Sequence, residues 1–192
     1  RLNHAREIAD AGQIQEALDR FAVTLTAHMK DKNPLVIALL PDSAVMLGTL
    51  MQRTVFAQQV AFAEFGTSGL CQIGNWPSLN ARTVVLLDGG RLSAGDYQQV
   101  AQDLGKRALT AIWLCRLLGT TTDDPPDGFD KSLNALNCDA PNVFGCGLDV
   151  LGYCRNLPGL YAYDKARGQS SSRSRLFLKT KNFSVKALGC ST

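Results

Sequence analysis

The stretch VVLLDGGRLSAGDY, residues 84–97, has the pattern of a buried strand that ends in a glycine-containing loop and opens a helix. Four apolar residues precede Asp88, and Gly89 and Gly90 follow it before Ser93. Loops of this kind, at the carboxyl end of a parallel strand, commonly hold a phosphate on backbone N–H groups. The stretch therefore predicts an α/β fold and a first candidate site.

Strands alternate with helices on both sides of this stretch. An apolar stripe with helical spacing runs from Ile14 to Met29. Residues 66–82 and 118–142 have the polar, glycine- and proline-containing composition of loops. Alternation of this kind is typical of a parallel sheet that helices cover on both faces. The other expected elements are strands at 33–40, 55–65, 83–88, 108–118 and within 143–164, and helices at 43–53 and 94–107.

Composition divides the chain into a body and a tail. The 192 residues are 45% hydrophobic, enough for one domain with a sizeable core. No apolar run reaches the roughly 18 residues that a membrane span needs. Residues 165–192 carry seven basic side chains and no acidic one, although the whole chain has a net charge of only +3. We therefore predict a domain at 1–164 and a basic C-terminal extension at 165–192.

The cysteines predict neither a zinc site nor a disulfide framework. The six cysteines form no CxxC pair, and the two histidines lie near the N-terminus. Several lie in apolar runs such as IWLCRLL and FGCGLDVLGYC, as buried thiols of a reducing compartment do. Because the chain begins with Arg1 rather than Met, we interpret it as a processed mature form or one that starts late.

Three segments together resemble the hypoxanthine-guanine phosphoribosyltransferases, which join a purine to phosphoribosyl pyrophosphate. VFGCGLDVLGYCRNLPGLYAYD (143–164) resembles the closing segment of that family, with its G-x-G-x-D motif and following Arg. VVLLDGGRLSAG (84–95) resembles the phosphoribosyl pyrophosphate loop, and PLVIALLPDSAVMLGTL (34–50) stands at the position of the pyrophosphate loop. The resemblance implies a parallel-sheet, type I phosphoribosyltransferase-like α/β domain. It also implies magnesium with phosphoribosyl pyrophosphate as the ancestral ligands.

The resemblance further implies which catalytic groups are missing. Asp88 stands for the first of two adjacent acids that bind the ribose hydroxyls and the metal, and Gly89 replaces the second. Ser93 occupies the position of the family's aspartate that is thought to act as a base. A serine has no useful basicity near neutral pH, and a positioned base is typically worth about 10²- to 10⁴-fold in rate.

The phosphate-binding positions implied by the resemblance are altered as well. After Gly95, Asp96 and Tyr97 replace the small and hydroxyl residues that surround the 5′-phosphate. In the pyrophosphate loop, Pro-Asp-Ser at 41–43 replaces Lys-Gly-Gly, so one backbone donor is lost. The carboxylate of Asp42 is expected to face the negatively charged ligand there.

The purine pocket lacks its anchor in the same comparison. Cys115, followed by Arg116, stands where the family has a lysine at the end of a strand. The segment before Val143 is short, so the aromatic residue that stacks on the purine is missing. Asp149 and Arg155 match family positions near the metal and the pyrophosphate.

We therefore predict no catalytic residue, no metal site and no cofactor. The vestigial residues have plain structural interpretations: an aspartate that caps a helix, or an arginine that pairs with a carboxylate. They are Asp88, Gly95, Asp149 and Arg155.

This pattern favours a catalytically inactive protein that acts as a structural or accessory subunit of a larger, mitochondrial assembly, with other protein subunits as partners. A cytoplasmic location is the alternative. One alternative function is an active purine phosphoribosyltransferase that uses Glu64, Asp123 or Asp124. The other is an RNA-binding accessory protein that uses the basic extension. The extension itself either docks on a partner, folds back on its own domain or remains solvated.

Overall fold

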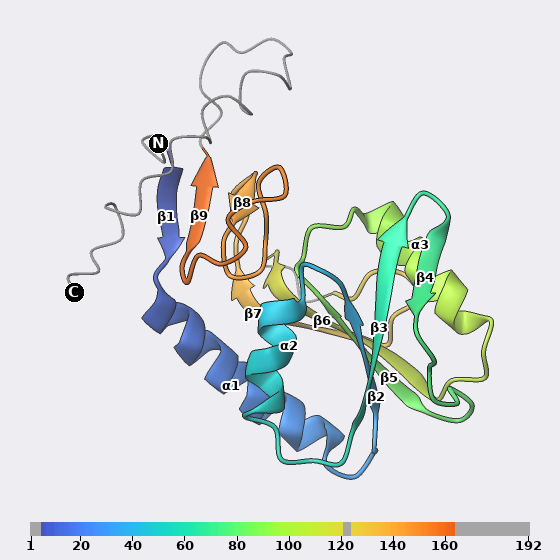
Figure 1. The fold of residues 1–192 in the computed structure, drawn as a ribbon. Helices are drawn as coiled ribbons and strands as arrows, with labels where there is room; N and C mark the ends of the chain where they lie inside the picture. The colour runs from blue at the N-terminus through green and yellow to red at the C-terminus, as the bar shows by residue number, and fades with distance from the viewer. Residues whose placement is uncertain (1–4, 121–123, 164–192) are drawn as a thin grey trace.

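The computed structural model describes residues 5–120 and 124–163, and its centre is a six-stranded sheet (Figure 1). Within this sheet, β3 (Gln59–Gly66) and β4 (Gly69–Ile73) pair in antiparallel fashion, and every other neighbouring pair is parallel. This arrangement confirms the predicted α/β fold with a parallel sheet. The strand order is β4 (Gly69–Ile73), β3 (Gln59–Gly66), β2 (Leu35–Leu39), β5 (Thr83–Asp88), β6 (Ala111–Gly119) and β7 (Lys131–Asn137).

Helices cover both faces of this sheet, as Figure 1 shows. α1 (Ala11–Met29) and α2 (Ala44–Met51) pack on one face, and α3 (Ala94–Gly105) packs on the other. The predicted apolar stripe of α1 is buried, and a capping box between Asp10 and Gln13 begins the helix. Every residue of β2 and β5 is buried, because these central strands have helices on both sides. No helix in the described part of the chain has both the length and the apolarity of a membrane span.

A second, smaller sheet lies beside α2, near the carboxyl ends of the parallel strands (Figure 1). It consists of β1 (Ala5–Ala9), β9 (Leu160–Tyr163) and β8 (Val143–Phe144), which pair in antiparallel fashion in that order. Phe144 is fully buried, and its ring stacks on Tyr163 with centroids 5.0 Å apart. We call this three-stranded sheet, with the loop between β8 and β9, the hood.

Three strands are absent from the sequence-based prediction. β1 was not anticipated, β4 lies within the expected loop at 66–82, and β7 lies within the expected excursion at 118–142. All three are edge strands, and edge strands expose residues that a central strand would bury. The strand expected at 55–65 begins only at Gln59. The extension at 165–192 lies outside the described residues.

Candidate functional site

Three loops meet at the carboxyl edge of the parallel sheet, where folds of this class commonly bind ligands. They are the β2–α2 loop, the β5–α3 loop and the loop of the hood. Gly147 of the hood approaches the β2–α2 loop so closely that a Cβ atom on it would lie 2.8 Å from the carbonyl oxygen of Asp42. This edge therefore contains most of the residues that the sequence comparison singled out.

Arg155 reaches from the hood into the centre of this edge. Its guanidinium donates to the carboxylate of Asp42, and Nη1 also donates to the carbonyl oxygen of Gly147 at 2.6 Å. Nη2 donates to Oδ1 of Asp149 at 3.0 Å. The predicted pairing of Arg155 with a carboxylate is confirmed, and two carboxylates share the guanidinium.

Arg91, from the β5–α3 loop, completes the group. Its Nη1 lies 2.9 Å from Oδ1 of Asp149, 3.0 Å from the carbonyl oxygen of Asp149 and 3.8 Å from Oδ2 of Asp42. Two carboxylates and two guanidiniums thus form one electrically neutral set, which we call the four-charge cluster: Asp42, Arg91, Asp149 and Arg155. Asp42 was expected to face a negatively charged ligand, whereas in the structure two arginines engage it.

The cluster favours the ionised form of Asp149. Partial burial opposes ionisation, but the backbone N–H of Gly152 donates to Oδ2 at 2.5 Å, and the charges of Arg155 and Arg91 add to this effect. The pKa of Asp149 is therefore lower than the ordinary value for this side chain.

Gly89 packs against Asp42 of this cluster and has no space for a side chain. A Cβ atom at this position would lie 2.5 Å from Cδ2 of Leu148 and 2.9 Å from Cβ of Asp42. Leu148, in the hood, is fully buried. A hood residue and a β2–α2 loop residue thus fill the space that a second acid after Asp88 would occupy.

Asp88 is buried and bonded within the protein. Its Oδ2 accepts a hydrogen bond from the hydroxyl of Tyr97 at 2.6 Å and another from the backbone N–H of Gly90 at 2.8 Å. Burial raises the pKa of Asp88 above its ordinary value, although these two hydrogen bonds act in the opposite direction. Asp88 therefore does not cap a helix, and the structural interpretation made for it is wrong. It accepts hydrogen bonds from α3 and from the loop that follows β5.

Ser93 is the N-cap of α3. Its Oγ accepts from the backbone N–H of Asp96 at 3.2 Å, and its own backbone N–H and hydroxyl both donate to Oδ2 of Asp96. The hydrogen bonds from Ser93 hold the pKa of Asp96 below its ordinary value. Gly95 lies in the first turn of α3 and is exposed. The start of α3, where a phosphate would bind in many α/β proteins, is thus capped by side chains of this chain.

We expect Ser93→Ala to lower the free energy of unfolding by about 1 kcal/mol, because the substitution removes an N-cap. Ser93→Asn retains a side chain that can cap the helix, so it should keep most of the stability. Urea denaturation measures both changes. Equal stability of the alanine variant and the wild type would contradict the assigned capping role.

Solved structures of hypoxanthine-guanine and hypoxanthine phosphoribosyltransferases have the same backbone arrangement. A hypoxanthine-guanine phosphoribosyltransferase from Bacillus anthracis matches with a TM-score of 0.70, over 82% of this chain and 97% of its own, at 16% sequence identity. A hypoxanthine phosphoribosyltransferase from Staphylococcus aureus matches with a TM-score of 0.70, over 85% and 95%, at 18% identity. The fold is that of the type I phosphoribosyltransferases.

The hypoxanthine-guanine phosphoribosyltransferase of L. donovani gives a similar result, with a TM-score of 0.69 over 82% of this chain and 99% of its own, at 15% identity. No protein-family model matches the sequence, and no curated protein matches it either. At these identities the likeness concerns the backbone. The chemistry of this phosphoribosyltransferase-like chain depends on its own side chains.

Cys115, at the predicted purine-anchor position, is a buried residue of β6 (Ala111–Gly119). β6 continues to Gly119, so Cys115 lies within the strand rather than at its end. Cys115 is completely buried in the core beneath α1 and α2, and burial raises the pKa of its thiol. Arg116, on the other face of β6, donates from Nε to Oδ1 of Asn134 at 2.8 Å and lies over the Tyr97 ring. Cys115 is therefore a core residue, as its apolar surroundings in the sequence had suggested.

The residues suggested for an active alternative lie in other parts of the chain. Glu64 is exposed on β3, opposite Cys71 of β4. Asp124 is exposed in the connection between β6 and β7, and Asp123 lies outside the described residues. Within residues 5–120 and 124–163, no three His, Cys, Asp or Glu side chains lie close enough to hold a metal ion.

The residues at the edge do not fit magnesium with phosphoribosyl pyrophosphate. Asp88, which stands for the first of the two acids expected in this loop, is buried and accepts a hydrogen bond from Tyr97. Gly89 has no space for the second acid. The two arginines nearby are already bonded to carboxylates. Sequence reasoning had missed the pairing of Arg91 and the packing of Leu148. No local sequence signal indicates either contact, because the contacting residues are distant in the chain. Arg91 and Asp149, for example, are 58 positions apart.

Proposed function

We propose that this chain is a catalytically inactive, phosphoribosyltransferase-like protein that serves as a structural or accessory subunit of a larger mitochondrial assembly. The observation that supports the inactive part of this proposal is the four-charge cluster at the carboxyl edge of the sheet. Its two arginines and two aspartates are bonded to one another and carry no net charge.

A ligand rich in phosphate would gain little at this edge. It would have to displace Asp42 and Asp149 from the guanidiniums and would then lie beside two uncompensated carboxylates. At the start of α3, the capping box engages the backbone N–H groups of Ser93 and Asp96, and the carboxylate of Asp96 adds a negative charge there. No described side chain at the expected base position accepts a proton near neutral pH, because that position holds Ser93.

Ligand binding tests the inactive part of the proposal. We expect phosphoribosyl pyrophosphate with magnesium to leave the melting temperature unchanged, and we expect no nucleotide from hypoxanthine or guanine. An active hypoxanthine phosphoribosyltransferase, assayed in parallel, shows that the reagents work. Nucleotide synthesis at rates that are normal for enzymes would overturn the proposal, and so would saturable, magnesium-dependent binding.

Native size tests the subunit part. Gel filtration of gently lysed mitochondria, with mass-spectrometric detection of this chain, should place it in fractions many times larger than one chain. The same companion proteins should accompany it after nuclease treatment. Elution as a free monomer or small homo-oligomer would overturn the subunit proposal. A shift to small size only after RNase treatment would instead favour the RNA-binding alternative.

A further inference from the structure

Basic side chains collect at the amino edge of the sheet, on the side away from the hood (Figure 1). We define this edge as the first residue of β2, β3, β5, β6 and β7 and the five residues before each. It contains six basic and three acidic residues, whereas the described residues as a whole have more acidic than basic side chains. The basic residues are Lys30, Lys32, Arg82, Lys106, Arg107 and Lys131, and the acidic ones are Asp31, Asp127 and Asp130.

Two lysines at this edge share one tryptophan. The ammonium group of Lys32 lies 5.0 Å from the centroid of the Trp113 ring, and that of Lys131 lies 5.2 Å from it. Trp113 is 4% exposed and belongs to the core beneath α1, so its ring is a rigid support for both. The carboxylate of Asp130 accepts from the backbone N–H of Ile112 at 2.7 Å and does not pair with the neighbouring Lys131. An aromatic ring attracts a cation without neutralising its charge.

Two arginines at the same edge also have uncharged partners. Arg82 donates to Oε1 of Gln59 and, at 2.8 Å, to the carbonyl oxygen of Asn33. The guanidinium of Arg107 lies over the ring of Trp76, 5.6 Å from its centroid. Both guanidiniums are therefore held in place and keep their full positive charge.

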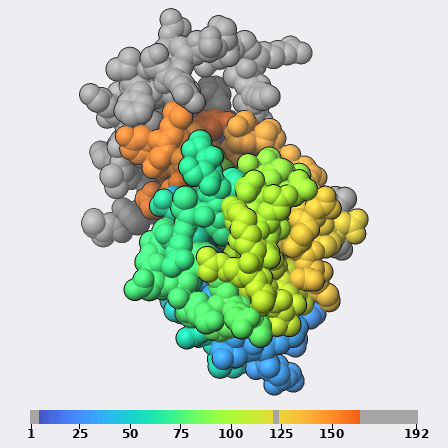
Figure 2. Space-filling model, turned by 90° about the vertical axis from the view of Figure 1, so that its right-hand side faces the viewer, coloured from blue at the N-terminus to red at the C-terminus, as the bar shows by residue number. Residues whose placement is uncertain are grey.

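Contacts between the segments join these four cations into one continuous strip. The carbonyl oxygen that Arg82 contacts belongs to Asn33, the residue after Lys32. The residue before Arg82 donates its backbone N–H to the carbonyl oxygen of the residue after Arg107, at 2.6 Å. In Figure 2, the blue, green and gold parts of the chain that carry these side chains meet at the lower end of the molecule. We call this set the amino-edge strip: Arg107, Arg82, Lys32 and Lys131.

The amino-edge strip is not neutralised from within. None of its four side chains forms an ion pair in the part of the chain that the structure describes. At the carboxyl edge, by contrast, carboxylates engage both Arg91 and Arg155. The helix dipole favours the two members of the strip that follow the ends of α1 and α3. It does not account for Arg82, directly before β5, or for Lys131, which begins β7. The strip therefore offers four positioned charges to an anion outside the protein.

We propose that the amino-edge strip binds the phosphate backbone of a single-stranded nucleic acid, without sequence preference. Each cation is already held in place, so binding costs little side-chain entropy, and release of counterions from the strand supplies the affinity. Arginine matches a phosphate group with paired N–H donors, and half-buried Trp76 adds an aromatic ring beside Arg107. Cations interleaved with aromatic rings are typical of surfaces that bind single strands.

This proposal concerns the edge opposite the candidate site. It is independent of whether the chain is catalytically inactive, because none of the four members belongs to the four-charge cluster. It also differs from nucleic-acid binding by the basic extension at 165–192, which contributes no residue to the strip.

Fluorescence anisotropy of a labelled oligouridylate of about 12 nucleotides tests the strip in the full chain. We expect Lys32→Gln, Arg82→Gln and Lys131→Gln each to weaken binding about fivefold at roughly 0.1 M salt. Each should also reduce the slope of log K against log salt concentration by about 0.7, the value for one phosphate contact on a single strand. Lys32→Arg keeps the charge and should bind as the wild type does.

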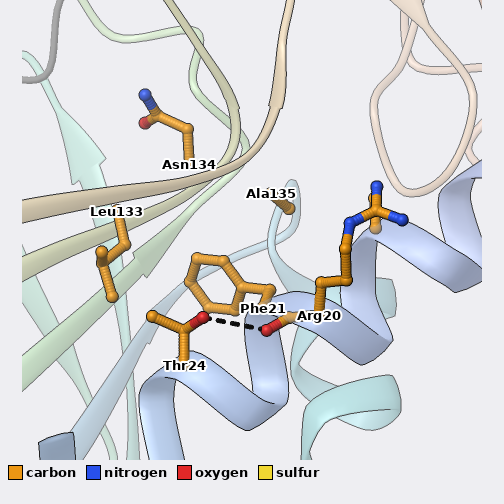
Figure 3. Close-up of a pocket in the computed structure, with 7 residues that line it drawn as sticks. Arg20, Phe21, Thr24, Leu133, Asn134 and Ala135 are labelled. Carbon is orange, nitrogen blue, oxygen red and sulfur yellow. Dashed lines mark hydrogen bonds between the residues drawn. The ribbon is translucent and has the colours of Figure 1, made fainter.

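Arg20→Gln is the matched control. It removes the same charge from α1, where Arg20 lies at a hollow of about 150 Å³ between α1 and β7 and outside the strip (Figure 3). Affinity and salt slope should both equal those of the wild type. A melting temperature close to that of the wild type confirms that each variant is folded.

Several outcomes would overturn the proposal. Equal losses from Arg20→Gln and from the strip variants would show that only the net charge matters. Loss of binding confined to the double variant Arg173→Gln and Arg175→Gln would place the nucleic acid on the basic extension. Equal competition by polyglutamate, at the same concentration of charges, would indicate an acidic protein partner. Absence of salt-dependent binding at about 0.1 M salt would exclude the proposed role altogether.

Discussion

Gly89→Asp is expected to destabilise the protein and to leave it unable to bind phosphoribosyl pyrophosphate. The substitution restores the pair of adjacent acids that the family resemblance implies for this loop. However, the new Cβ would lie 2.5 Å from Leu148 and 2.9 Å from Cβ of Asp42, well inside normal contact distances. Inserting carbon atoms into a packed site typically costs about 1–3 kcal/mol, and here a carboxylate would also approach Asp42.

Urea denaturation and a ligand-induced melting shift measure the two expected effects. Gly89→Ala separates crowding from charge and should still cost about 1–3 kcal/mol. Gly48→Ala is the matched control, because a Cβ atom there has no neighbour within 4 Å and lies on a helix. It should raise stability by about 0.5–1 kcal/mol. Magnesium-dependent ligand binding by Gly89→Asp would show that the loop opens readily, contrary to our interpretation of the site.

Arg155→Leu is expected to lower the free energy of unfolding by about 2–3 kcal/mol. The substitution removes hydrogen bonds to Asp42, Asp149 and the carbonyl oxygen of Gly147. Hydrogen bonds to charged groups are worth about 1.5–3 kcal/mol, and breaking a buried ion pair costs about 3–5 kcal/mol. The Arg155 side chain is 30% exposed, so we expect a cost below that upper range.

The pH dependence of the free energy of unfolding provides a second measurement on the Arg155→Leu variant. The lowered pKa of Asp149 stabilises the fold above the ordinary carboxyl value of 3.8, and this contribution disappears as the pH falls through the lowered value. Without Arg155, the acid-dependent loss of stability from this carboxylate should be smaller. Arg20→Leu is the control, since Arg20 is 70% exposed and its contact with Glu16 is 4.0 Å long. Equal losses from the two variants would contradict the role assigned to the cluster.

The local pattern of the sequence predicts the centre of the fold closely. The predicted strand at 83–88 is β5, and the predicted helix at 94–107 is α3 with a boundary two residues shorter. Both succeed because their signals are local: consecutive apolar residues for a buried strand, and apolar residues at helical spacing for the helix. β7 was missed because its seven residues are mostly half-buried and include two asparagines, so the composition resembles that of a loop.

The candidate site could be predicted only in part. The altered identities at positions 89 and 93 can be read directly, and they indicate that an acid and a base are missing. What replaces them depends on contacts between distant segments, such as Arg155 with Asp42 across 113 positions. The same holds for Leu148, whose position over Gly89 is set by the hood as a whole. The residue identities therefore indicate that an acid and a base are missing. Only the structure shows which side chains fill the space beside Gly89.

The pairing of β1 with β9 brings the two ends of the described chain together. Ala5 lies opposite Tyr163, so everything that precedes residue 5 and everything that follows residue 163 emerges from the same small sheet. The two ends of the described chain therefore lie side by side. Proteins with adjacent ends commonly tolerate circular permutation, in which these ends are joined and new termini are opened elsewhere. A partner that bound to this small sheet would contact both ends of the described chain at once.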